Sequence, residues 1–235
     1  MSFARIGDKG LREAIERAYE AAKRAGTVAE AEHLEAERRQ MADRDRPVDE
    51  LIETRRRSLA ALPSYHLDFL ERLERAEGKG QSPPLKYGLR MVRASWAAGA
   101  WWESRRAQRL GLLLARPDSG LSTALVWLGR YAADAGRVVR YLHAGQLAAV
   151  ARDGGLDRYH GADLLLIDNL GAAPPGAWSE AIETLVDSYH ASLSRGCWAA
   201  AHPPLGRLRA RVGDAVVAHL TDRHAGGALL EDKDG

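Results

Sequence analysis

Short, continuous apolar runs alternate with longer amphipathic stretches over the second part of the chain. We predict that the runs are buried strands, because parallel strands covered on both faces lose the alternation of apolar and polar residues. The predicted strands are 110–115, 138–142, 163–168 and 197–201, and the predicted helices are 85–102, 122–135, 144–151 and 178–193. This alternation indicates an α/β fold, a parallel sheet of about five strands with helices on both faces.

The first part of the chain has the apolar period of helices alone. Apolar residues recur at three- and four-residue steps in 11–22, 27–41, 48–59 and 67–73. Each stripe is too narrow to bury much surface by itself. We therefore expect a helical N-terminal domain that packs on a partner or on a second copy of the chain.

Charge and chain-breaking residues place the boundary between the two parts. Charged residues fill 33 of the first 84 positions but only 33 of the other 151. The stretch GKGQSPP at 78–84 stops a helix and is typical of a linker. The sequence thus predicts a helical domain at 1–84 and an α/β domain at 85–235.

Composition narrows the class of protein. Hydrophobic residues make up 46% of the chain, enough for a core, and a single cysteine, Cys197, excludes a disulfide scaffold. No apolar run is long enough to span a membrane, and the N-terminus lacks the apolar stretch of a signal peptide. A net charge of +2 is too small to indicate a nucleic-acid binder on its own. We expect a cytoplasmic protein with no membrane partner.

The turn after the first predicted strand is a candidate phosphate site, because ligands of open parallel sheets bind beyond the carboxyl ends of the strands. The turn ARPDSGLST at 115–123 has the context of a P-loop, whose pattern is G-x-x-x-x-G-K-[ST]. Ala115 replaces the first glycine and Leu121 replaces the lysine. An ordinary turn with Ser122 as helix N-cap stays an alternative. The candidate residues are Asp118, Ser119, Gly120, Leu121, Ser122 and Thr123.

The third predicted strand ends at a second candidate, Asp168. An acid after four apolar residues is typical of the P-loop segment that holds Mg²⁺, directly or through water. Efficient hydrolysis usually needs a glutamate next, and Asn169 cannot accept the proton of the attacking water. The fourth strand runs into His202, which could sense a γ-phosphate or serve only as a turn residue.

The order of these segments resembles the AAA+ core of the DnaA/DnaC clade, which includes bacterial helicase loaders, IstB-type transposition helpers and DnaA-related regulators. The resemblance covers about two-thirds of the chain and implies an AAA+ core without an obvious lid. It is carried by LGLLLARPDSGLSTAL at 110–125, ADLLLIDNLG at 162–171, SLSRGCWAAAHPPLGRL at 192–208 and RVGDAVVAHL at 211–220.

Three departures from that family decide the expected chemistry. Leu121 replaces the P-loop lysine, and Asn169 replaces the catalytic glutamate. In the segment that resembles the arginine-finger region, the matching positions are Ala215 and His219 instead of arginine. Losing one such group costs a factor of about 10³ or more, judged by the arginine finger. We therefore expect a pseudo-ATPase with no catalytic residue, no metal ligands and no required cofactor. Weak binding of ATP or ADP with Mg²⁺ stays open.

The leading hypothesis is a degenerate, helicase-loader-like adaptor in DNA replication or recombination. It would bind a replicative helicase or another replication factor through residues 1–84, and it could form a homo-oligomer. Alternatives are a DnaA-related regulator, favoured by the short stretch 143–162, or a divergent, weakly active ATPase.

A further alternative is a single-stranded DNA-binding module with an aromatic and basic patch. These side chains could equally pack the helix that precedes the first strand on the sheet. The patch would consist of Trp101, Trp102, Arg105, Arg106 and Arg109.

Overall fold

The computed structural model of the 235-residue chain describes residues 47–95, 108–172, 178–192 and 194–232. The helices predicted at 11–22 and 27–41 lie outside these ranges. The chain divides into two compact units, Met1–Leu51 and Ile52–Gly235. None of the helices that the structure describes is long and apolar enough to cross a membrane.

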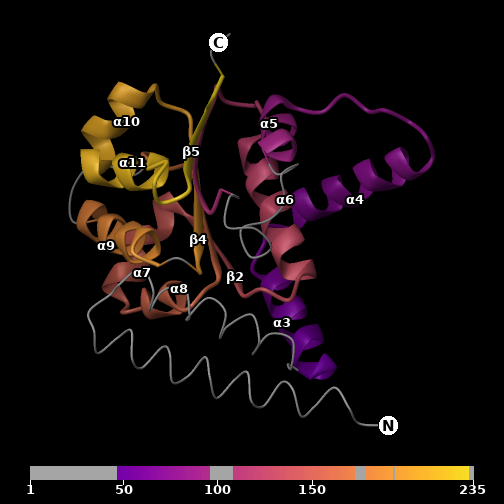
Figure 1. The fold of residues 1–235 in the computed structure, drawn as a ribbon, viewed down its shortest axis with the longest axis horizontal. Coiled ribbons are helices and arrows are strands. Elements are labelled where there is room, and N and C mark those ends of the chain that lie inside the picture. Colours follow the sequence, from indigo (N-terminus) through magenta and orange to yellow (C-terminus); the bar gives the residue numbers. More distant parts are fainter. Residues whose placement is uncertain (1–46, 96–107, 173–177, 193, 233–235) are drawn as a thin grey trace. The chain divides into compact units, whose positions relative to one another are not determined.

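Five parallel strands form one sheet in the order β2-β3-β4-β1-β5, which confirms the predicted α/β fold (Figure 1). All but the last were located from their apolar runs. The strands are β1 (Leu110–Leu114), β2 (Val139–His143), β3 (Leu164–Asp168), β4 (Gly196–Ala201) and β5 (Gly227–Glu231).

Helices cover both faces of the sheet (Figure 1). One face carries α3 (Val48–Ala60), α4 (Ser64–Gly78), α5 (Tyr87–Ser95) and α6 (Leu121–Asp134). The other carries the 3₁₀ turn η2 (Ala144–Gln146), α7 (Leu147–Arg152), α8 (Asp157–His160), α9 (Trp178–His190), α10 (Leu205–Val212) and α11 (Asp214–Thr221).

Neighbouring residues of β1 point to opposite faces and enter two separate buried clusters. Leu112 packs with α9 and α11, and Leu113 packs with α4 and α6. Gly111 leaves room for the indole of Trp198 on β4, since a Cβ at this glycine would lie 2.3 Å from the ring. The sheet is therefore covered by apolar side chains on both sides, as its continuous apolar runs predicted.

Helices α3 and α4 pack on the sheet domain. Leu70 of α4 is fully buried in the cluster that includes α6. The Ser58 hydroxyl of α3 accepts from the N–H of Val139 at the start of β2. The compact unit accordingly begins at Ile52, ahead of the linker expected at 78–84. Leu70 and Leu73 on the apolar stripe of α4 are thus covered by the chain's own core.

Candidate functional site

A pocket of about 300 Å³ lies at the carboxyl end of β1. Its walls come from α4, from Lys86 just ahead of α5, from the loop 117–123 and from His202 after β4. The structure thus brings together several of the residues predicted from the sequence. Those that line the pocket are Asp118, Gly120, Leu121, Ser122, Thr123 and His202.

The loop before α6 has two residues with left-handed backbone. Asp118 has φ +66° and Gly120 has φ +84°. Gly120 is the N-cap of α6 and offers no side-chain cap, so the first N–H groups of the helix are not capped by a side chain. The alternative of Ser122 as N-cap is therefore wrong, since Ser122 already lies in the first turn of α6.

Asp168 ends β3 and is only 7% exposed. Its carboxylate accepts hydrogen bonds from the hydroxyl of Ser122 (3.1 Å), the hydroxyl of Tyr141 (2.5 Å) and the N–H of Asn169 (2.9 Å). Burial, and next the Asp168 carboxylate, raise the pKa of Tyr141 well above its ordinary value. Tyr141 therefore stays a donor and holds the carboxylate in place.

The juxtaposition of Ser122 and Asp168 fits a hard divalent cation. Mg²⁺ takes oxygen ligands, and one or two carboxylates together with the phosphates of a substrate are the usual contribution to such a site. The Ser122 hydroxyl and the Asp168 carboxylate are the oxygens that would hold Mg²⁺. Asn169, with φ +57°, directly follows Asp168 in the sequence. It supplies an amide at the position where hydrolysis usually needs a carboxylate.

The side chain of Leu121 lies in the core and is 2% exposed. It belongs to the buried cluster shared by α5 and α6. The position that carries lysine in a P-loop therefore contributes packing here and no charge toward the pocket.

Two pocket residues, His66 and Lys86, were not predicted from the sequence. The His66 Nδ1 is hydrogen-bonded to the hydroxyl of Thr123 at 3.0 Å. Burial lowers the pKa of His66, the nearby Lys86 ammonium adds to the decrease, and the Asp168 carboxylate opposes it. His66 comes from the part of the chain that the charge step assigned to another domain, Lys86 lies just after the linker expected at 78–84, and no local motif marks either residue.

His202 sits beside the start of the loop, next to β4. Its Nδ1 is hydrogen-bonded to the carbonyl of Ala115 at 3.1 Å, and its ring lines the pocket. The structure places it near the expected phosphate position, where it also holds the backbone at the start of the loop.

Arg109 does not belong to a DNA-binding surface patch, because it is only 5% exposed. Its guanidinium donates to the carbonyls of Tyr189 (2.7 Å) and His190 (2.8 Å) at the end of α9. The last carbonyls of a helix have no partner within it, so Arg109 caps α9. The remaining patch residues, Trp101, Trp102, Arg105 and Arg106, lie outside the described residues.

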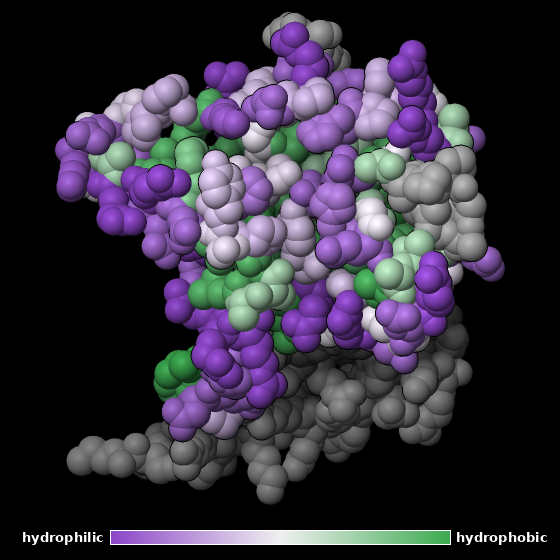
Figure 2. Space-filling model, turned by 180° about the vertical axis from the view of Figure 1, so that it is seen from behind, coloured by the Kyte–Doolittle hydropathy of each residue, from purple (hydrophilic) through white to green (hydrophobic). Residues whose placement is uncertain are grey.

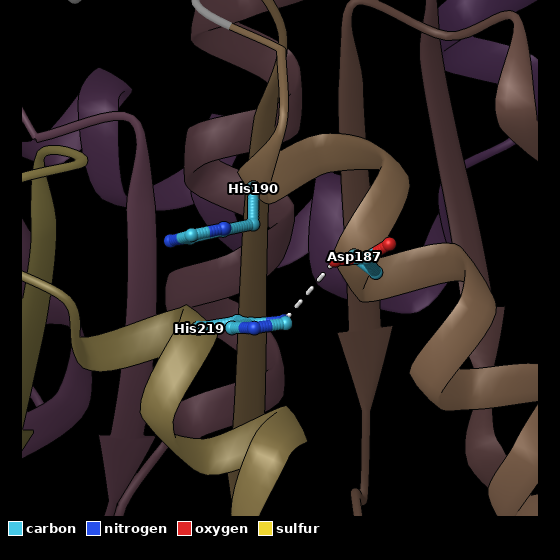
Figure 3. A group of neighbouring side chains, drawn as sticks. All are labelled: Asp187, His190 and His219. Atoms are coloured by element: carbon cyan, nitrogen blue, oxygen red, sulfur yellow. Dashed lines mark ion pairs between the residues drawn. The ribbon is translucent and has the colours of Figure 1, made fainter.

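A cluster of Asp187, His190 and His219 joins α9 to α11 (Figure 3). The imidazoles stack in parallel, with centroids 4.3 Å apart and planes 10° apart. The lone pairs of parallel rings do not converge on one ion, so this arrangement favours ion pairing over metal binding. His219 faces Asp187 at 3.7 Å, and His190 contacts Asp222 at 2.9 Å. The His190 contact lowers the pKa of Asp222 below its ordinary value.

Sheet order and the loop–acid pair define an α/β domain with a P-loop-like pocket. No protein-family model matches the sequence, and no curated protein matches it. Among solved structures, the chain is similar to the DnaC helicase loader at 17% identity and a TM-score of 0.47, covering 60% of this chain and 86% of that one.

Two further structures are similar at the same level. AMPPCP-bound DnaA from Aquifex aeolicus has 18% identity and a TM-score of 0.49, with 63% of this chain and 50% of that one covered. DnaI has 12% identity and a TM-score of 0.47, with 61% and 78% covered. These proteins belong to the clade that the motifs resemble, and at such identities the likeness concerns the fold alone.

Proposed function

We propose that this protein is a degenerate AAA+-type adaptor that binds a nucleotide without hydrolysing it and acts in DNA replication or recombination. The observation that carries the proposal is the contact between Ser122 and Asp168 at the carboxyl edge of the sheet. It keeps the loop hydroxyl and the strand-end acid together at a pocket, while Leu121 is buried and Asn169 follows the acid. The site therefore supports binding but lacks groups for turnover.

The finger segment supports the absence of turnover. Ala215 and His219 lie on α11, and His219 faces Asp187 of the same chain. Arg211 donates to the carbonyl of Gly171 at 2.7 Å. Both of these basic side chains make contacts within the chain, which supports the proposed lack of an arginine finger in this segment.

Nucleotide titration tests the proposed site. We expect a fluorescent ATP analogue with Mg²⁺ to bind the full-length protein, with no release of phosphate above background. Asp168→Asn, which keeps the shape but removes the charge, is expected to weaken binding about tenfold or more, since hydrogen bonds to charged groups contribute about 1.5–3 kcal/mol. Asp157→Asn, on α8, is the matched control. Absence of wild-type binding at millimolar nucleotide contradicts the proposal, and phosphate release abolished by Asp168→Asn contradicts the lack of turnover.

The adaptor role is assigned to the N-terminal residues. On α3, Val48 and Ile52 are 70% and 60% exposed and stand four residues apart, on one side of the helix. The face of the molecule seen in Figure 2 is mostly hydrophilic, with hydrophobic surface confined to small areas.

A deletion that stops before α3 tests the adaptor role. Removing residues 1–46 together with Val48→Ser and Ile52→Ser is expected to abolish capture of a replicative helicase while the α/β domain keeps its melting temperature, because the compact unit starts at Ile52 and both side chains are exposed. Removing 1–84 would not discriminate, since it also removes Leu70 and its packing on α6. Capture that survives the combined change would overturn this part of the proposal.

A further inference from the structure

Leu121 occupies the position of the P-loop lysine, but another lysine, Lys86, lies against the loop at Gly120. Lys86 directly precedes α5, whose start is fixed to the loop by a hydrogen bond from the N–H of Gly88 to the carbonyl of Ser119 (3.0 Å). A Cβ at Gly120 would lie 2.6 Å from the Cβ of Lys86 and 2.9 Å from its Cδ. The lysine stem therefore lies against the loop backbone at the residue that begins α6.

Glycine at position 120 is required by two independent features. Its φ of +84° belongs to the left-handed region, which favours glycine. Its missing side chain also leaves the space through which Lys86 passes. The close approach of Lys86 is thus part of the loop's geometry, and the residue lines the pocket together with Ser122 and Thr123.

The charge of Lys86 faces the pocket lining formed by the described residues. Among the residues that the structure describes, no carboxylate forms an ion pair with it. The pocket also contains Asp118, which is exposed, and Asp168 lies next to it with its oxygens held by hydrogen-bond donors. Lys86 and His66 both line the pocket, and the Lys86 ammonium adds to the decrease that burial causes in the pKa of His66.

The pocket therefore presents cationic and neutral donors where an anion would lie. Lys86 supplies a mobile point charge, the kind that lysine contributes to phosphate binding. Ser122 and Thr123 supply hydroxyls, and the start of α6 supplies N–H groups without a side-chain cap. His66 and His202 add two imidazoles to the lining.

We propose that Lys86 replaces the missing P-loop lysine from outside the loop and binds the phosphate chain of a nucleotide in this pocket. The proposal rests on the nucleotide-binding part of the proposed function and assigns the cation of that site. It makes the segment between α4 and α5 part of the binding site. A lysine that enters from this side contacts the phosphates without being anchored on α6, so its position depends on the packing of α4 and α5.

Binding of a fluorescent ATP analogue with Mg²⁺ to the full-length protein tests this assignment. Lys86→Ala is expected to reduce affinity about tenfold or more and Lys86→Glu to reduce it further, while Lys86→Arg stays within about threefold of the wild type. Lys79→Ala, at an exposed lysine after α4, is the matched control and should bind like the wild type. Tripolyphosphate should displace the analogue from the wild type, since the phosphate chain is what Lys86 contacts.

The outcomes separate this assignment from the proposed function. Wild-type binding that needs Asp168 but is unchanged, or tighter, in Lys86→Ala overturns the assignment and leaves the proposed function standing. Failure of tripolyphosphate to compete assigns recognition to the base or sugar, and it overturns the assignment as well. Absence of wild-type binding at millimolar nucleotide overturns both.

Discussion

Replacing Arg109 with alanine is expected to lower the free energy of unfolding by about 3 kcal/mol. The guanidinium is 5% exposed and donates to the carbonyls of Tyr189, His190 and Ser192. These carbonyls lie at the end of α9, where no intrahelical donor is present. Without Arg109 the carbonyl of Tyr189 keeps the N–H of Ser192 (3.2 Å), whereas the partly buried carbonyls of His190 and Ser192 lose the guanidinium. Such a loss costs about 1–3 kcal/mol for each group that water cannot reach.

Chemical denaturation followed by circular dichroism measures this loss. Arg207→Ala, on the exposed side of α10, is the control and should change the free energy by less than about 0.5 kcal/mol. Arg109→Lys should recover part of the stability, since one ammonium cannot reach all the carbonyls. A loss below about 1 kcal/mol in Arg109→Ala would show that water replaces the guanidinium and that the cap is dispensable.

Leu70→Ala is the second large expected effect, a loss of about 3 kcal/mol. Leu70 lies on α4, and its side chain is fully buried in the cluster that includes α6. Truncation removes buried methyl groups and leaves a cavity that α4 can close only by shifting. Because α4 also carries His66, the shift is expected to loosen the hydrogen bond to Thr123 at the pocket.

Chemical denaturation and amide hydrogen exchange distinguish a loss of stability of the whole domain from a loss confined to α4. Unfolding should remain one transition with a lower midpoint, and the amides of α4 should lose protection more than those of β3. Glu71→Ala, at the exposed neighbouring position, should leave both unchanged. If Leu70→Ala leaves the unfolding of the sheet unaffected, α4 belongs to a separate helical domain, as the charge step at 78–84 suggested.

The strands could be predicted where the chain is apolar without interruption. Runs such as 163–168 are covered on both faces, and the structure places β1, β3 and β4 within one residue of the predicted limits. Strand β5 gave no such signal, because it is short, lies at the edge of the sheet and has an exposed Leu229 and a terminal acid. An edge strand pairs on one side only, so fewer of its residues need to be apolar.

The loop and Asp168 could be predicted because each is a local pattern beside a strand end. His66 and Lys86 could not, since they reach the pocket only through the packing of α4 and α5. Within 47–84, which the structure describes, many of the charged residues lie on exposed helix faces, such as Arg56 and Arg57 beside Glu53. Over this range, high charge density therefore accompanies solvent exposure.

The hydrogen bond between His66 and Thr123 couples the packing of α4 to ligand binding in the pocket, although the two residues are far apart in the sequence. His66 belongs to the helix that follows the N-terminal residues, and Thr123 to the first turn of the pocket helix. A ligand that orders the pocket therefore changes the free energy with which α4 packs on α6. By thermodynamic reciprocity, a partner protein that binds the N-terminal residues and displaces α4 changes the affinity of the pocket for its ligand. The ligand changes the affinity for that partner by the same factor. If the pocket binds nucleotide without hydrolysing it, as we propose, the position of α4 still depends on whether the pocket is filled.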